Sequence, residues 1–264
     1  MKRHYISLWL LLLSAFVIFA VLSAFDMPEV GGYTPRSSGI ADALFASRPA
    51  ETPQADSVVA DTAALAVTDS FPMPVDTAAQ TILLIGDSML DGISPRLAAY
   101  AEHNGHTLYT VIWYSSTSQV WGSSTRLKEY IGRLNPTFIV ICLGANELFV
   151  RDIEAKREKY VRKIIEDIGN IPFVWIGPPN WRDDTGINGM IARMVPRGSF
   201  FLSNGMTFER GRDGAHPTHA SAALWVDSVA RWMPANAAHP IRLDTPQKSS
   251  GRPRRTFVHQ PNDK

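Results

Sequence analysis

The sequence predicts an α/β protein, a three-layer αβα sandwich around a central parallel sheet. Short apolar runs alternate with longer amphipathic stretches from about residue 80 to residue 234, and this alternation is typical of parallel sheets covered by helices on both faces. The run Phe138–Leu143 holds five apolar side chains and one cysteine, as expected of a strand that is buried on both faces.

The elements follow one another in a regular order. Expected strands are 81–85, 107–113, 138–143, 171–176 and the weaker 200–202, and expected helices are 93–104, 124–134, 153–168, 187–194 and 218–233. Pro136 ends the second helix, because proline has no N–H to continue the hydrogen-bond ladder. Ligands of parallel sheets bind at the carboxyl ends of the strands. We therefore expect the segments that follow these strands to meet at one rim of the sheet.

Three of those segments carry residues that suit nucleophilic catalysis. A Gly-Asp-Ser turn ending at Ser88 follows the first strand, Asn146 follows the third, and Asp213 and His216 precede the last helix. A serine hydroxyl is a poor nucleophile until an imidazole removes its proton, and a carboxylate holds that imidazole in the right tautomer. The order of the segments therefore predicts a triad of Ser88, His216 and Asp213.

The same segments resemble the sequence blocks of the SGNH (GDSL-type) hydrolases. Gly86–Met89 resembles the first block, and Asp213–Pro217 is similar to the fifth. Gly144–Glu147 resembles the third block, with Glu147 where aspartate is usual. The glycine of the second block is missing, and by spacing Ser118 takes its place. The resemblance covers residues 80 to 234, and three blocks in the right order are a more specific signal than any one alone.

The resemblance implies a flavodoxin-like sandwich and an ester hydrolase. Ser88 would attack the ester carbonyl, and the oxyanion would be held by the N–H of Ser88, a backbone N–H near Ser118 and the side-chain amide of Asn146. One such donor is typically worth ~3 kcal/mol of barrier. No cofactor is expected, and no His, Cys or Asp cluster has the spacing of metal ligands. A net charge of +1 gives no reason to expect a nucleic-acid partner.

The two ends of the chain suggest where it works. After the basic start Met1–Tyr5, the stretch Ile6–Phe25 holds no charge and is long enough to span a bilayer as a signal anchor. The basic flank should stay in the cytoplasm, which places the rest in the periplasm or at the cell surface of a bacterial-type cell. A cleaved signal, giving a secreted protein, is the alternative. Expected next are a flexible Ala/Pro/Ser/Thr/Asp-rich spacer (26–79), the hydrolase domain (80–236) and a disordered basic tail (237–264).

The substrate is less well defined by the sequence. An acylated carbohydrate, in particular an O-acetyl group of a cell-surface glycan or peptidoglycan, suits an anchored extracytoplasmic domain. Trp113, Trp121 and Trp181 fall near the expected rim and could stack on sugar rings. Two alternatives stay open. One is acyl transfer to a polysaccharide beside a membrane-bound acyltransferase, using the same triad. The other is a catalytically degenerate glycan-binding module, which the missing glycine favours.

Overall fold

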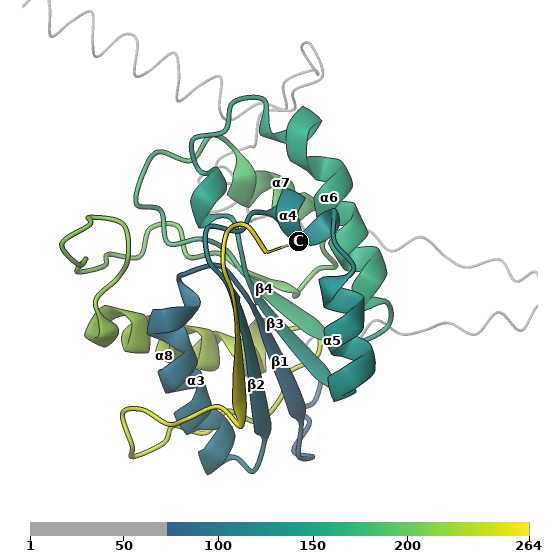
Figure 1. Cartoon of the computed structure of the whole chain (residues 1–264). Coiled ribbons are helices and arrows are strands. Elements are labelled where there is room, and N and C mark those ends of the chain that lie inside the picture. Colours follow the sequence, from purple (N-terminus) through teal and green to yellow (C-terminus); the bar gives the residue numbers. More distant parts are fainter. Residues whose placement is uncertain (1–72, 264) are drawn as a thin grey trace, which may run out of the picture. The chain divides into compact units, whose positions relative to one another are not determined.

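The computed structural model describes residues 73–263, and the centre of this part is a six-stranded, all-parallel sheet (Figure 1). Its strand order is β5-β4-β3-β1-β2-β6. The strands are β1 (Thr81–Gly86), β2 (Thr107–Trp113), β3 (Phe138–Cys142), β4 (Phe173–Ile176), β5 (Phe200–Phe201) and β6 (Arg255–His259). The helices are α3 (Leu90–His103), α4 (Ser118–Gly122), α5 (Arg126–Leu134), the 3-10 turn η1 (Ala145–Glu147), α6 (Ile153–Ile168), α7 (Ile187–Met194) and α8 (His219–Asn236).

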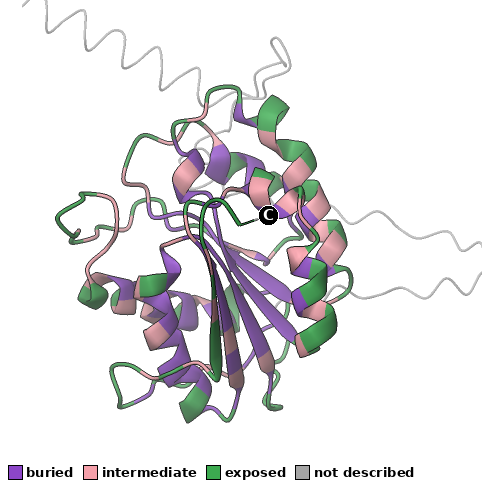
Figure 2. Cartoon of the chain, viewed as in Figure 1, coloured by how far each residue is buried: buried purple, intermediate pink, exposed green. Residues whose placement is uncertain are grey.

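Helices cover both faces of the sheet, which confirms the predicted three-layer class (Figure 1). On β1, Ile82 and Leu84 pack with the side chains of α3 and α8, whereas Leu83 and Ile85 pack with those of α5, α6 and α7. The central strands are buried along their length (Figure 2). Burying one such aliphatic side chain contributes roughly 1.5–3 kcal/mol, so the sheet is a rigid base for the loops at its rim.

Most of the predicted elements lie where the sequence places them. The bounds of β2, α6 and α7 are as predicted, while α3 begins three residues earlier, at Leu90 rather than residue 93. The short helix α4 was not predicted, because five residues are too few for a periodic pattern. Cys142 is buried in β3, as expected of a core residue.

The prediction of a disordered tail over 237–264 is wrong for the residues described. After α8 the chain crosses α3, where the N–H of Gly251 donates to the carbonyl of Pro95 at 2.8 Å. A Cβ at Gly251 would come within 2.7 Å of the backbone of Ala99. The chain then forms β6, which pairs with β2 (Figure 1). Backbone pairing with an open sheet edge leaves little apolar periodicity, and for this reason the composition suggested disorder.

The folded unit also begins before residue 80. The N–H of Asp76 donates to the carbonyl of Pro240 at 2.7 Å, and Asp76 accepts from the N–H of Arg242. Residues 73–79 of the predicted spacer therefore belong to this unit. The predicted anchor (1–25) and the rest of the spacer lie outside the described residues. Within residues 73–263, no helix combines the length and the apolar character needed to cross a bilayer.

Candidate active site

Ser88 lies in a tight turn between β1 and α3. The turn begins at Gly86 because any larger residue would clash there: a Cβ would lie 2.2 Å from the carbonyl oxygen of Cys142. The fully buried carboxylate of Asp87 then accepts the N–H of Met89 at 2.9 Å, which fixes the turn. Ser88 is left half-buried at the carboxyl end of β1, where its hydroxyl faces the loop that precedes α8.

The structure brings the three residues of the predicted triad together. Nδ1 of His216 lies 2.7 Å from Oδ2 of Asp213, and Nε2 of His216 lies 2.8 Å from Oγ of Ser88. A carboxylate only accepts, so Nδ1 carries the proton and donates to Asp213. In the neutral ring Nε2 is then an acceptor, and the hydroxyl of Ser88 donates to it. This tautomer is the one that a general base requires.

Asp213 is held ionised by its own loop. The backbone N–H of Ala215 donates to its Oδ1 at 2.9 Å, and the N–H of His216 donates to the same oxygen at 3.0 Å. These bonds, led by that from Ala215 and joined by the His216 ring, lower the pKa of Asp213 to about 2. The carboxylate is exposed, so it orients the imidazole through hydrogen bonds and not through burial.

An arginine that sequence analysis did not single out holds this loop in place. The guanidinium of Arg210 donates to the carbonyl of Ala215. It also donates to the carbonyls of Pro179 at 3.3 Å and Asn180 at 2.9 Å, in the loop between β4 and α7. One side chain therefore ties the histidine loop to the loop that follows β4. No sequence motif marks such a role, because the partners are backbone oxygens.

Ser118 does not supply an oxyanion donor, so that prediction is wrong. Ser118 is fully buried, its N–H donates to Oε2 of Glu147 at 2.8 Å, and its hydroxyl donates to Oε1 at 2.8 Å. Nε of Arg157 also donates to Oε1 of Glu147, at 2.6 Å. The physical reason is that Glu147, buried in an ion pair with Arg157, accepts the hydrogen bond of this N–H at the start of α4. The N–H is therefore not available to an oxyanion. The two departures from the family pattern, Ser118 and Glu147, thus contact each other.

Ser115, and not Ser118, lies at the cavity that contains Ser88. It has a left-handed backbone with φ of 57°, a conformation that favours glycine. It also lines the same cavity as Ser88 and His216. Among residues 73–263, the N–H groups of Ser88 and Ser115 have no acceptor. Positive φ cannot be read from a serine-rich run, so Ser115 could be singled out only from the structure.

Asn146 also lies at this rim, on η1 directly after β3. Gly144, with φ of 121°, makes the turn that leads to it. Its Nδ2 donates to the carbonyl of Ser116 at 3.0 Å and, at the long distance of 3.4 Å, to Oδ2 of Asp87. The amide is therefore beside the turn that carries Ser88, and the long bond to Asp87 is the weaker of its two hydrogen bonds and the one that a ligand would replace.

Two of the three predicted sugar-stacking tryptophans belong to the core. Trp121 has no exposed surface and Trp113 is 3% exposed. Their rings meet edge to face at 5.5 Å, and Nε1 of Trp113 donates to the carbonyl of Gln260. The segment after β6, which was predicted to be disordered, covers Trp113. Trp181 is half-buried; its Nε1 donates to the carbonyl of Ala145 at 3.0 Å, so it alone stays a candidate.

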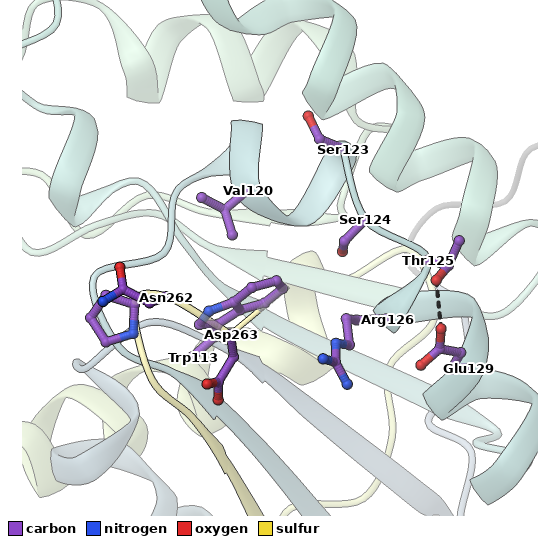
Figure 3. Close-up of a pocket in the computed structure, with 10 residues that line it drawn as sticks. Trp113, Val120, Ser123, Ser124, Thr125, Arg126, Glu129, Asn262 and Asp263 are labelled. Atoms are coloured by element: carbon purple, nitrogen blue, oxygen red, sulfur yellow. Dashed lines mark hydrogen bonds between the residues drawn. The ribbon is translucent and has the colours of Figure 1, made fainter.

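Residues at the end of β2 and directly after it line two cavities. One, of about 460 Å³, is lined by Ser88 and His216 together with Tyr114 and Ser115. A larger one of about 760 Å³ is shown in Figure 3, and Trp113, Arg126 and Asp263 are among the residues that line it. The larger cavity holds no serine–histidine pair, so the chemistry belongs to the smaller. No group of three metal-ligating side chains occurs within residues 73–263.

Comparison with known proteins gives similarities of structure only. No protein-family model matches the chain, and no curated protein matches its sequence. The chain is similar to the esterase EstA from Pseudoalteromonas sp., which was solved with monoethylphosphonate as inhibitor. The two sequences are 19% identical, the TM-score is 0.41, and the match covers 58% of this chain and 97% of that one. It is also similar to a protein from Desulfitobacterium hafniense DCB-2 assigned to the G-D-S-L family of lipolytic proteins, at 14% identity and a TM-score of 0.40, covering 57% and 98%. We therefore base the function on the geometry of the site.

Proposed function

We propose that the protein is a serine esterase of the SGNH type, which cleaves its substrate through an acyl-enzyme on Ser88. The observation that carries this proposal is the chain of two short hydrogen bonds, 2.8 Å from Ser88 to His216 and 2.7 Å from His216 to Asp213, at the wall of a 460 Å³ cavity. Three residues from two distant segments meet in the geometry that nucleophilic catalysis needs.

The reaction follows from this arrangement. Oγ of Ser88 attacks the ester carbonyl carbon while Nε2 of His216 takes its proton, and the carbonyl electrons move to oxygen. The tetrahedral intermediate collapses when His216 returns that proton to the leaving alcohol, which departs and leaves an ester on Ser88. Water, deprotonated by His216, then attacks that ester. His216 returns the proton to Oγ of Ser88 as the acyl–oxygen bond breaks, which releases the acid and restores the enzyme. Asp213 holds the ring and stabilises its positive charge throughout.

The negative oxygen of the intermediate is stabilised by three donors. The N–H groups of Ser88 and Ser115 have no acceptor among residues 73–263, and both residues line the cavity. The amide of Asn146 contacts Asp87 and Ser116, their neighbours in sequence. Removing one such donor typically costs about 100- to 1,000-fold in rate. The missing glycine does not favour a degenerate binding module, because Ser115 adopts the backbone conformation that a glycine would adopt there.

For the substrate we propose an acylated carbohydrate, in particular an O-acetyl group of a cell-surface glycan or of peptidoglycan. The uncharged stretch Ile6–Phe25 behind a basic start supports an anchored, extracytoplasmic domain. The cavity at Ser88 supports a polar substrate, because its wall includes a carboxylate, a phenol and two imidazoles. Such a wall suits hydroxyl groups better than a long alkyl chain.

Hydrolysis of p-nitrophenyl acetate by the full-length chain tests the proposal. Ser88→Ala and His216→Ala should each lower kcat/KM by a factor of about 1,000 or more, and the double variant should be little worse, because the two residues act as a unit. Ser228→Ala, at a half-buried position of α8, and His103→Ala, at an exposed position of α3, are matched controls, and they should behave as the wild type. Additive losses in the double variant, or no hydrolysis by the wild type, would refute the triad.

The same experiment can include an acetylated glycan and an acceptor glycan. Release of free acetate supports hydrolysis. Acetate appearing on the acceptor instead of in solution would show that a sugar hydroxyl, and not water, receives the acyl group. The triad chemistry is common to both outcomes, so only the product distinguishes them.

A further inference from the structure

A pair of polar side chains in the wall of the active-site cavity has no part in the triad. Asp91 lies in the first turn of α3, and Tyr114 follows β2. The hydroxyl of Tyr114 donates to Oδ1 of Asp91 at 3.2 Å. Both residues line the same 460 Å³ cavity as Ser88 and His216. Asp91 is exposed, whereas Tyr114 is half-buried with its ring packed against the edge of the core.

We propose that Asp91 and Tyr114 bind the alcohol half of the ester, and that the enzyme thereby selects hydroxyl-rich alcohols that carry no negative charge. The substrate would be an ester of a neutral or amino sugar, and esters of uronic acids would be discriminated against. This inference rests on the proposed esterase function and adds to it the class of alcohol.

The position of His216 indicates which half of the ester fills the cavity. Nε2 must return its proton to the leaving oxygen, so the alcohol has to lie on the His216 side of Ser88. His216 and the neighbouring residues Pro217 and His219 line this cavity. A volume of about 460 Å³ is much larger than an acetyl group needs and is within the range of ordinary small-molecule sites.

The charge of the cavity wall supports the second part of the inference. Asp91 is the one carboxylate among the described residues that line the cavity, and neither lysine nor arginine lines it. Within residues 73–263, no ion pair neutralises Asp91. The guanidinium of Arg210 is directed to backbone carbonyls of two loops instead. A carboxylate on the alcohol would therefore meet an uncompensated like charge.

The size of the expected discrimination follows from Coulomb's law. For two unit charges about 6 Å apart in an effective dielectric constant of about 40, the repulsion corresponds to about a tenfold loss in kcat/KM. A tyrosine hydroxyl that hydrogen-bonds a sugar hydroxyl should contribute about a three- to tenfold effect on KM. The two effects separate, because Asp91 acts by charge and Tyr114 by a neutral hydrogen bond.

The test uses two substrates that differ only in charge: a mono-O-acetylated methyl glucuronide and the corresponding glucuronamide. Acetate release by the full-length chain gives kcat/KM for each. The wild type should prefer the amide by about tenfold, and Asp91→Asn, which keeps the acceptor for Tyr114, should reduce that preference to about threefold or less. Tyr114→Phe should raise KM for the amide by three- to tenfold while the preference stays.

Glu102→Gln is the matched control, because it removes one negative charge from the last turn of the same helix, where Glu102 is 57% exposed. It should change neither rate constant. Equal rates on the two substrates in the wild type, or a preference that Asp91→Asn leaves intact, would overturn the inference. Failure of the esterase proposal looks different: p-nitrophenyl acetate and both sugars would then go uncleaved.

Discussion

The buried ion pair between Glu147 and Arg157 should be a major determinant of stability. The side chain of Glu147 has no exposed surface, that of Arg157 is 16% exposed, and their atoms approach to 2.6 Å. Arg162 and Glu158 form a similar pair on the same helix, α6, but their side chains are 61% and 49% exposed. The two pairs differ mainly in burial, so Arg157→Met and Arg162→Met form a matched comparison.

The expected magnitudes follow from that difference. Removing one partner of a buried pair leaves an uncompensated charge and costs about 3–5 kcal/mol. Ser118 still donates two hydrogen bonds to Glu147, so the lower end, about 3 kcal/mol, is expected for Arg157→Met. Arg162→Met should cost about 0–1 kcal/mol. For a folded unit of this size, 1 kcal/mol lowers Tm by about 2–4 °C, giving a loss of about 6–12 °C for Arg157→Met.

Thermal and urea unfolding of the full-length chain measure both quantities. A further variant, Arg157→Met with Glu147→Gln, removes the buried charge itself and should recover part of the lost stability. If Arg157→Met and Arg162→Met are equally destabilising, or if adding Glu147→Gln makes the protein less stable still, the charge-burial reasoning is refuted.

Three more predictions follow from the site and the sequence. Burial raises the pKa of Asp87 from 3.8 to about 7, so this carboxyl stabilises the fold below pH of about 4 and loses that contribution as pH rises to about 7. Asp87→Asn should therefore gain stability relative to the wild type across that window, and a pH-independent difference in urea unfolding would contradict this. Asn146→Ala should lower kcat on p-nitrophenyl acetate by about a hundredfold, and a normal kcat would show that the amide is not part of the oxyanion hole. Ser115→Gly should retain most activity, whereas Ser118→Ala should lose stability rather than activity. Protease added to intact cells should release an active soluble fragment by cutting within 26–72, because that segment has too little apolar content to pack. If the chain is instead protected from outside protease, the domain lies in the cytoplasm.

The sequence was sufficient to predict the fold class and the three residues of the triad. Buried strands such as β3 leave an unbroken apolar run, and α6 leaves a clear helical period, so both could be identified without a structure. Their alternation then placed Ser88 and His216 at one rim. Topology constrains these positions strongly, because a parallel sheet brings all of its carboxyl ends together.

The errors arose where contacts, rather than patterns, determine the structure. β6 is recruited by the open edge of β2 through backbone hydrogen bonds, which any sequence can make. The N–H of Ser118 donates a hydrogen bond to Glu147, which lies 29 residues away in the sequence. Ser115 is suited to its position by a backbone angle, and not by its side chain. Trp113 is buried by the segment after β6, so the error about the tail also produced the error about the tryptophan.

Labelling with a fluorophosphonate, followed by peptide mass spectrometry, tests the central claim most directly. An activated serine attacks phosphorus and expels fluoride, leaving a stable adduct on its oxygen. The hydrogen bond of 2.8 Å from Ser88 to His216 predicts a single adduct on Ser88, absent in Ser88→Ala and strongly slowed in His216→Ala. A folded wild-type protein that takes no label, or that takes it on a serine other than Ser88, would contradict the account.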